Sequence, residues 1–207
     1  MATVLDLLAD EAASVSSVRE RGAAMRVHVE DSLDGLRVAQ LREARRIADI
    51  GAGAGFPGLV LAAALPEARV YLVESVGRKC AFIDRAAAAA GLDNADVVCA
   101  RAEEWPGQVD AVTARALAPL NILVEYAAPL LELGGALVAW KGRPDLAEEA
   151  DGAAAAAVVG LELADVVEIE ARQGADERRL YVYLKVLETP ARFPRRAGMA
   201  RKRPIRA

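Results

Sequence analysis

The stretch most able to do chemistry is DIGAGAGFPG, residues 49–58, which packs four glycines and a proline directly behind the apolar-leaning segment RRIADI. Glycine reaches positive φ at little cost and has no Cβ, so a ligand can approach the backbone closely. A loop of this kind after a parallel strand lies at the carboxyl end of the sheet, where open α/β folds bind ligands. The stretch therefore predicts a ligand-binding loop.

The spacing of the glycines distinguishes two classes of nucleotide ligand. A dinucleotide fingerprint, G-x-G-x-x-G, read from Gly51 and Gly53 would need glycine at position 56, which is Phe56. The observed order is Asp49, Gly51, Gly53 and Gly55, or D-x-G-x-G-x-G. This order resembles motif I of the class I methyltransferases that use S-adenosylmethionine, in which the methionine part lies against the bare backbone.

A carboxylate stands at the end of the next expected strand. Glu74 can accept hydrogen bonds from both hydroxyls of a ribose there. Binders of nicotinamide and of sulfonium nucleosides share such a residue, so it does not separate them. A surface charge at a strand end is the alternative interpretation.

The elements that must position these residues follow from hydrophobic periodicity. We predict strands over 45–50, 69–75, 95–100, 109–116 and 136–142, and helices over 57–65, 77–91, 120–135 and 145–160. Two alternating segments, 163–171 and 178–186, favour an antiparallel hairpin at the sheet edge. The expected fold is α/β and Rossmann-like: a seven-stranded, mostly parallel sheet with an antiparallel edge hairpin.

Length and composition favour one soluble domain. The 207 residues suit a single α/β core. Charges break the apolar runs, and none reaches the roughly 20 residues needed to cross a bilayer. The first residues, MATVLDLLADEAASV, are acidic where a signal peptide would be positive. We expect a cytoplasmic protein without membrane association.

The two cysteines, Cys80 and Cys99, are separated by an expected helix and strand, without CxxC spacing or a histidine cluster. This pattern supports neither a zinc site nor a redox motif, and no metal is expected. In a reducing cytosol we predict two buried or half-buried free thiols.

Charge is distributed unevenly along the chain. The net charge is −4, yet residues 190–207 carry seven arginine and lysine side chains and no acidic one. An acidic body with a basic tail suggests a polyanionic partner. A solvated terminal tail is the alternative.

Seven segments, taken in order, resemble the RsmG or GidB family of bacterial methyltransferases, which methylate N7 of a guanine in small-subunit ribosomal RNA. They are HVEDSL (28–33), DIGAGAGFPG (49–58), VESVGRK (73–79), ARAEEW (100–105), ARAL (114–117), AWKG (139–142) and FPRRAGMARKRPI (193–205). The first and last are the most specific, because generic methyltransferases lack them. The resemblance implies S-adenosylmethionine as cofactor and 16S ribosomal RNA, or the small ribosomal subunit, as partner.

The resemblance also implies which residues hold the cofactor. They are Gly51, Gly53, Phe56, Glu74, Ala102, Glu103 and Arg115. The loop residues would touch the methionine part, Glu74 the ribose, the next pair the adenine, and Arg115 the side from which the methyl leaves. Each has a structural alternative: Phe56 as core, Glu103 as a helix-start charge, and Arg115 paired with Glu74 or Asp31.

Contacts to RNA are expected from cations at the same rim and in the tail. These are Lys141, Arg195, Arg196, Arg201, Lys202 and Arg203. Lys141 ends the fifth expected strand, and a solvated strand end is its alternative.

Guanine N7 carries a lone pair and no proton, so no general base is expected and no catalytic residue is assigned. His28 is the single histidine. We expect it to hydrogen-bond Asp31 or Ser32 and to order the segment that covers the cleft; a general-base role is the alternative.

The expected organisation is an N-terminal helical cap over 1–44, a cofactor-binding domain over 45–189 and a basic tail over 190–207. Family members usually carry more sequence before their HVEDSL counterpart, including an Asn-Leu-Thr segment that this chain lacks. The start is therefore expected to be internal, or the cap reduced. A methyltransferase for another substrate, an RNA-binding module with a vestigial cofactor site and a nicotinamide dehydrogenase are the rival interpretations.

Overall fold

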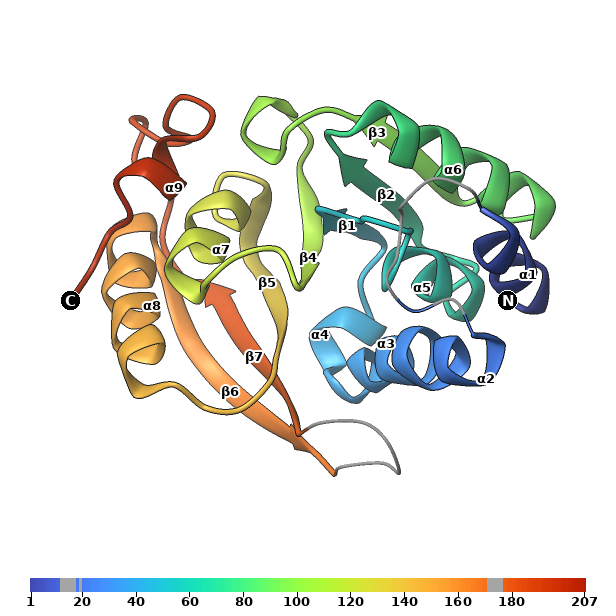
Figure 1. The fold of residues 1–207 in the computed structure, drawn as a ribbon. Helices are drawn as coiled ribbons and strands as arrows, with labels where there is room; N and C mark the ends of the chain where they lie inside the picture. Colours follow the sequence, from blue (N-terminus) through green and yellow to red (C-terminus); the bar gives the residue numbers. More distant parts are fainter. Residues whose placement is uncertain (12–17, 19, 171–176) are drawn as a thin grey trace.

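A computed structural model describes residues 1–11, 18, 20–170 and 177–207. Within these residues the chain forms one seven-stranded sheet in the order β3-β2-β1-β4-β5-β7-β6, with helices on both faces (Figure 1). The strands are β1 (Arg46–Ile50), β2 (Arg69–Glu74), β3 (Ala95–Cys99), β4 (Val109–Arg115), β5 (Leu131–Lys141), β6 (Leu161–Ile169) and β7 (Arg178–Lys185).

The first five strands are parallel, and β7 pairs antiparallel with both β5 and β6. The predicted mostly parallel sheet with an antiparallel edge hairpin is therefore confirmed. Because β1 lies between β2 and β4, the chain reverses its direction of strand addition there. Such a switch point opens a crevice at the carboxyl ends of the strands.

One face of the sheet is covered by the N-terminal elements and by the helices that follow β1 and β2. These are α1 (Ala2–Asp10), α2 (Arg21–Ala24), η1 (Met25–Glu30), α3 (Asp31–Leu33), η2 (Asp34–Arg37), α4 (Ala39–Arg42), α5 (Gly58–Ala64) and α6 (Gly77–Ala89). The other face carries η3 (Ala102–Glu104), α7 (Leu120–Ala127), α8 (Leu146–Val159) and α9 (Met199–Lys202). In the described parts of the chain, no helix has the length and apolar character of a membrane span.

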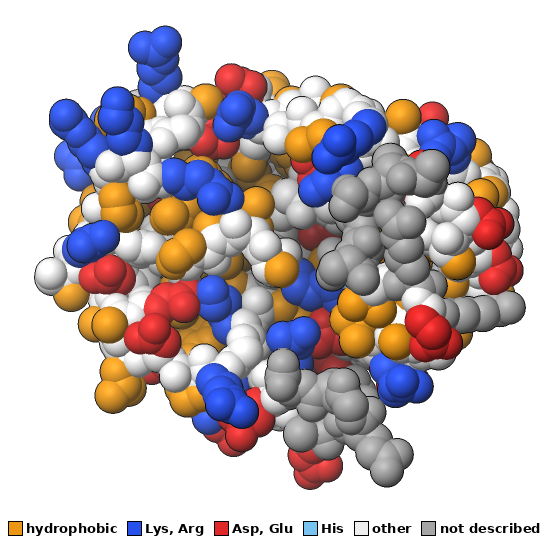
Figure 2. Space-filling model, viewed as in Figure 1, with side chains coloured by type: hydrophobic (Ala, Val, Ile, Leu, Met, Phe, Trp, Pro, Cys, Tyr) orange, Lys and Arg blue, Asp and Glu red, His pale blue; other side chains and the backbone are white. Residues whose placement is uncertain are grey.

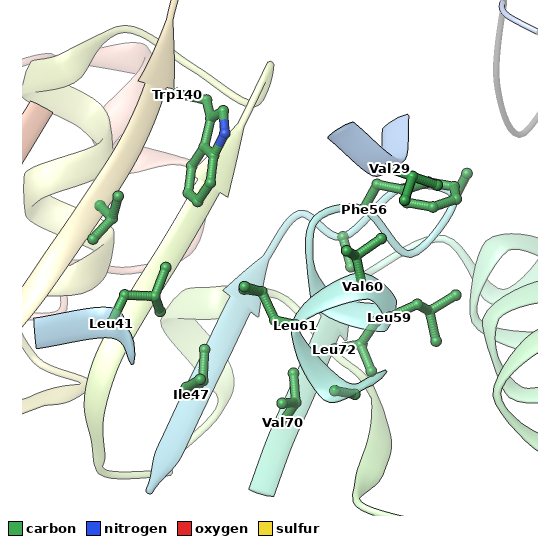
Figure 3. Close-up of a cluster of buried hydrophobic side chains, with 14 of the residues drawn as sticks. Val29, Leu41, Ile47, Phe56, Leu59, Val60, Leu61, Val70, Leu72 and Trp140 are labelled. Carbon is green, nitrogen blue, oxygen red and sulfur yellow. The ribbon is translucent and has the colours of Figure 1, made fainter. Parts of the chain in front are cut away.

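Side-chain alternation divides each central strand between two cores. Ile47 of β1 joins the core under α5, which Figure 3 shows, while its neighbour Ala48 joins the core under α7. In β5, Val138 and Leu137 divide in the same way. Both faces are therefore apolar, as parallel strands require.

The helix predicted over 120–135 is shorter in the structure. It ends at Ala127, and β5 already begins at Leu131. Pro129 explains the difference, because proline has no N–H to donate and so cannot continue the hydrogen bonding of the helix. The apolar run that follows is therefore extended.

The prediction of two free thiols is wrong: Cys80 and Cys99 form a disulfide. Cys80 lies in the first turn of α6, and Cys99 ends β3. Because α6 follows β2 and β3 pairs with β2 in parallel, both cysteines come to the same edge of the sheet. Their Cα atoms are 5.8 Å apart, within bridging range.

The ends of the chain pack on the central sheet. Leu5 and Leu8 of α1 belong to the core that contains Phe82 of α6, and Phe193 and Ala200 belong to the core of α7. In Figure 1, α1 accordingly lies beside α6 and α9 beside α7. The division into cap, domain and tail stays a prediction.

Candidate functional site

A cavity of about 350 Å³ opens at the carboxyl ends of β1, β2 and β4. All seven residues predicted to hold the cofactor line it: Gly51, Gly53, Phe56, Glu74, Ala102, Glu103 and Arg115. They come from the carboxyl ends of β1 to β4 or from the connections that follow these strands, which lie together because the carboxyl ends of parallel strands meet at one edge of the sheet. Their contact with a cofactor stays a prediction.

Two glycines of the loop after β1 are constrained in different ways. Gly51 has φ +67°, a conformation that residues with a Cβ rarely adopt, and a Cβ there would meet Leu117 Cδ1 at 2.5 Å. Gly53, with φ +61°, donates its N–H to Glu74 Oε2 over 3.0 Å. The loop therefore packs against Leu117 of the β4–α7 connection at Gly51 and is hydrogen-bonded to Glu74 at Gly53.

Asp49, in β1, stabilises this loop through hydrogen bonds of its side chain. Its buried carboxylate accepts the Gly58 N–H over 2.8 Å and the Thr113 hydroxyl over 3.1 Å. Burial raises the pKa of Asp49 to about 7, against the opposing effect of these two hydrogen bonds and of Arg115. Asp49 therefore joins the strand end, the start of α5 and the neighbouring strand.

Glu74 is buried and organises the backbone around it. Oε1 accepts the N–H groups of Ser75 and Val76 over 2.8 and 2.9 Å, and Oε2 accepts that of Gly53. A carboxylate has about four acceptor positions, so three backbone donors leave room for a ligand hydroxyl. Because Glu74 lines the cavity, it can accept a hydrogen bond from a ligand there.

Arg115 ends β4, and its guanidinium contacts residues 27–31 of η1 and α3. Nη1 donates to Val27 O over 2.8 Å and to Asp31 Oδ2 over 2.7 Å, and Nη2 lies 3.2 Å from His28 Nδ1. The alternative pairing with Asp31 is thus present in the structure. Arg115 also lines the cavity, so the same side chain pairs with Asp31 and is available to a ligand.

His28 stacks on Phe56, with ring centroids 4.7 Å apart and ring planes 10° from parallel. Its carbonyl accepts the Ser32 hydroxyl, while its ring bonds Arg115 and the backbone of Val18, where we expected Asp31 or Ser32. Burial, together with the Arg115 charge, lowers the pKa of His28 to about 4. The ring is therefore neutral near pH 7 and holds the segment over the loop.

Because the pKa of His28 is lower in the folded chain than in the unfolded chain, we expect His28 to make the free energy of unfolding depend on pH. The unfolded chain binds a proton near pH 6.5 that the folded chain refuses until about pH 4. The contribution of the neutral His28 ring to folding stability is therefore fully present above pH 6.5 and is lost as the pH falls toward 4. Between about pH 7.5 and pH 5, His28→Asn should lose about 1 to 2 kcal/mol less stability than the unaltered protein, measured by urea unfolding. Equal losses of stability in His28→Asn and in the unaltered protein would contradict the lowered pKa of His28.

The C-terminal segment forms one wall of the cavity. Gly198 donates its N–H to Glu103 Oε1 over 2.9 Å, and Arg201 Nη2 donates to Leu117 O over 2.8 Å. Arg201 and Tyr126 both line the cavity. The predicted adenine-side residue Glu103 is therefore held by the basic tail.

The predicted RNA-contact residues differ in their surroundings. Arg195 forms a two-pronged ion pair with the buried Glu125. Lys141 Nζ lies 2.5 Å from Glu148 Oε1 and also donates to a backbone carbonyl. The remaining four are exposed: Arg196, Arg201, Lys202 and Arg203. Lys and Arg side chains gather over α9 at the upper left of Figure 2.

Some cavity residues were not singled out from the sequence. Lys79, in the first turn of α6, and Arg101, shortly after β3, lie within the motif segments VESVGRK and ARAEEW, and that membership was the available signal. Tyr126 sits inside α7 and is brought in by helix packing alone. Ala116 has φ +53° and follows Arg115 at the rim.

Comparison with known families supports the motif assignment. The family model GidB, described as rRNA small subunit methyltransferase G, matches residues 5–180. A relative from Rubrobacter xylanophilus, named Ribosomal RNA small subunit methyltransferase G, is 43% identical over 94% of this chain and 78% of its own length. A relative of the same name from Pelotomaculum thermopropionicum is 38% identical over 90% of this chain and 80% of its own.

Solved structures share the fold. A mutant of MtNAS in complex with S-adenosylmethionine is 17% identical, with a TM-score of 0.63 over 89% of this chain and 71% of that one. The fibrillarin pre-rRNA processing protein of Methanococcus jannaschii is 18% identical, with a TM-score of 0.59 over 72% and 70% of the two chains.

Proposed function

The chain belongs to the GidB family of rRNA small subunit methyltransferases, and we propose that it transfers a methyl group from S-adenosylmethionine to N7 of a guanine in 16S ribosomal RNA. The observation that carries the proposal is the cavity itself: the D-x-G-x-G-x-G loop, Glu74 and Arg115 meet there at the sheet's switch point. The same proposal places the protein in the cytoplasm, where ribosomal RNA is made.

The residues present fit a sulfonium nucleoside. The volume of about 350 Å³ falls in the range of small-molecule sites. Glu74 retains acceptor capacity for a ribose hydroxyl, and the bare backbone at Gly51 and Gly53 admits close approach. Ala102 and Glu103 also line the cavity, and we assign them to the adenine.

The chain's own contribution to the reaction is positioning and charge. The cofactor supplies an electrophilic methyl group on a positively charged sulfur. Guanine N7 needs no deprotonation, and His28, neutral with Nδ1 facing Arg115, is not placed to take a proton. Holding two reactants in attack geometry can contribute about 7 to 11 kcal/mol. We assign that task to the loop, to Glu74 and to the rim around Arg115.

The direct test is to map the modified base. Ribosomal RNA from cells with and without the gene is treated with borohydride and aniline, which cleave the chain at N7-methylguanine. We expect one site in 16S RNA to lose cleavage when the gene is absent and to regain it when the purified protein and S-adenosylmethionine are added. Identical cleavage patterns in the two RNA samples would reject the proposal.

Exposed cations of the C-terminal segment are proposed to contact RNA phosphates. Replacing Arg196, Lys202 and Arg203 by Gln should reduce the slope of log K against log salt by about 2 to 3, because each phosphate contact releases about 0.7 to 0.9 counterion. The affinity for S-adenosylmethionine should stay the same.

The control removes charge near the amino end of β1, with Arg42→Gln in α4 and Arg45→Gln just before β1, both at exposed positions. Filter binding to 16S RNA at several salt concentrations measures both variants. An equal change of slope per charge removed in the two variants would contradict a specific role for the C-terminal segment.

A further inference from the structure

Asp31 joins three strands to the N-terminal segment through one side chain and its carbonyl. Oδ2 accepts Arg115 Nη1 over 2.7 Å, and Oδ1 accepts Arg178 Nε over 2.8 Å. The Asp31 carbonyl accepts Trp140 Nε1 over 2.8 Å. The Asp31 side chain is 8% exposed and that of Arg115 13% exposed, so their ion pair lies largely out of water.

The hydrogen-bond inventory of Arg115 shows what the pair leaves open. Both Nη1 hydrogens are used, by Val27 O and Asp31 Oδ2, and one Nη2 hydrogen points to His28 Nδ1. A guanidinium has five N–H donors. Within the described part of the chain, Nε–H and the second Nη2–H have no acceptor, so they are available to a ligand in the cavity that Arg115 lines.

Charge at this position has a direct chemical consequence. S-adenosylmethionine carries a positive sulfonium, whereas the product S-adenosylhomocysteine has a neutral thioether. An unbalanced, largely buried guanidinium at the cavity would repel the substrate form and not the product. Such a site would favour its own product and be inhibited by it.

Asp31 supplies the balancing charge at Arg115. The second partner, Arg178, is 33% exposed, so water and salt screen its charge more than that of Arg115. The other charged groups that line the cavity are Glu74 and Glu103, with Lys79, Arg101 and Arg201 as cations. Among the described residues, no carboxylate other than Asp31 forms an ion pair with Arg115.

We propose that Asp31 is a specificity-determining positioning residue: it aims the Arg115 guanidinium into the cavity and cancels its charge, so that the site accepts the cationic methyl donor in preference to the neutral product. The inference rests on the cofactor part of the proposed function and is independent of which RNA base is methylated.

The test is the ratio of two dissociation constants, measured by isothermal titration calorimetry with S-adenosylmethionine and S-adenosylhomocysteine. Asp31→Asn keeps one oxygen acceptor and the backbone contact to Trp140. We expect the variant to weaken binding of the methyl donor about 5- to 10-fold more than binding of the product. A purely structural role would weaken both ligands equally, and that result overturns the proposal.

Two further variants make the test specific. Asp34→Asn makes the same substitution at another buried carboxylate three residues along, which pairs with Arg37, and should leave the ratio unchanged. Arg115→Gln should shift the ratio the other way, toward the methyl donor, because the negative charge of Asp31 is then balanced only by the more exposed Arg178. Should Asp31→Asn fail to fold, the Arg115→Gln ratio decides alone, and an unchanged value overturns the proposal. An unaltered protein that binds neither ligand would instead reject the proposed function.

Discussion

Glu74→Gln should lower the affinity for S-adenosylmethionine by about 100-fold or more, because hydrogen bonds to a charged acceptor contribute about 1.5 to 3 kcal/mol each. An amide can accept at only one of its two ends. The other end would turn an NH₂ group toward Gly53 N–H or toward the N–H groups of Ser75 and Val76, which now donate to the carboxylate. The substitution thus removes a ribose acceptor and disturbs the loop that should hold the methionine part.

Calorimetric titration with the cofactor measures this loss, and circular dichroism checks that the variant is folded. Glu104→Gln is the matched control, because Glu104 is exposed in η3 and is not among the residues that line the cavity. It should bind the cofactor as the unaltered protein does. A folded Glu74→Gln protein with near-normal affinity would show that the ribose contact is wrongly assigned.

The fold could be predicted because most of its determinants are local. Strand-length apolar runs, the glycine loop and the alternating segments near the C-terminus each indicate one element, and the parallel order follows from them. The errors come from opposing local signals and from tertiary proximity. Pro129 ends α7 inside an apolar run that otherwise reads as helical. The Cys80–Cys99 disulfide depends on the register of β2 with β3.

The candidate site could be predicted in part for the same reason. Residues at strand ends, such as Glu74 and Arg115, are brought together by any parallel sheet. What covers them could not be inferred from spacing. Asp31 meets Arg115 across 84 positions, and Gly198 meets Glu103 across 95. Such contacts arise only when the two ends of the chain fold back over the sheet.

The ion pair between Arg195 and Glu125 should be the most sensitive point of the C-terminal segment. Glu125 is 2% exposed on α7, and Arg195 holds both of its oxygens. Arg195→Met would leave a buried carboxylate without its cation, which typically costs about 3 to 5 kcal/mol. Urea unfolding should show that loss, while Arg196→Met, one position along and exposed, should change stability by about 0.5 kcal/mol or less.

A second substitution separates charge from packing. Adding Glu125→Leu to Arg195→Met should recover most of the lost stability, because replacing a buried ion pair by apolar side chains is often neutral. If the double variant is as unstable as the single one, the loss comes from packing around Phe193 and not from the stranded charge.

Removal of residues 191–207 should therefore affect more than RNA binding. It would strand Glu125 and also remove the Gly198 N–H from Glu103 and the Arg201 contact at the cavity mouth. We expect such a truncation to lose stability and cofactor affinity together with RNA affinity, so the exposed cations must be tested by substitution instead. A truncated protein that kept its stability and bound S-adenosylmethionine normally would contradict this structural role of the C-terminal segment.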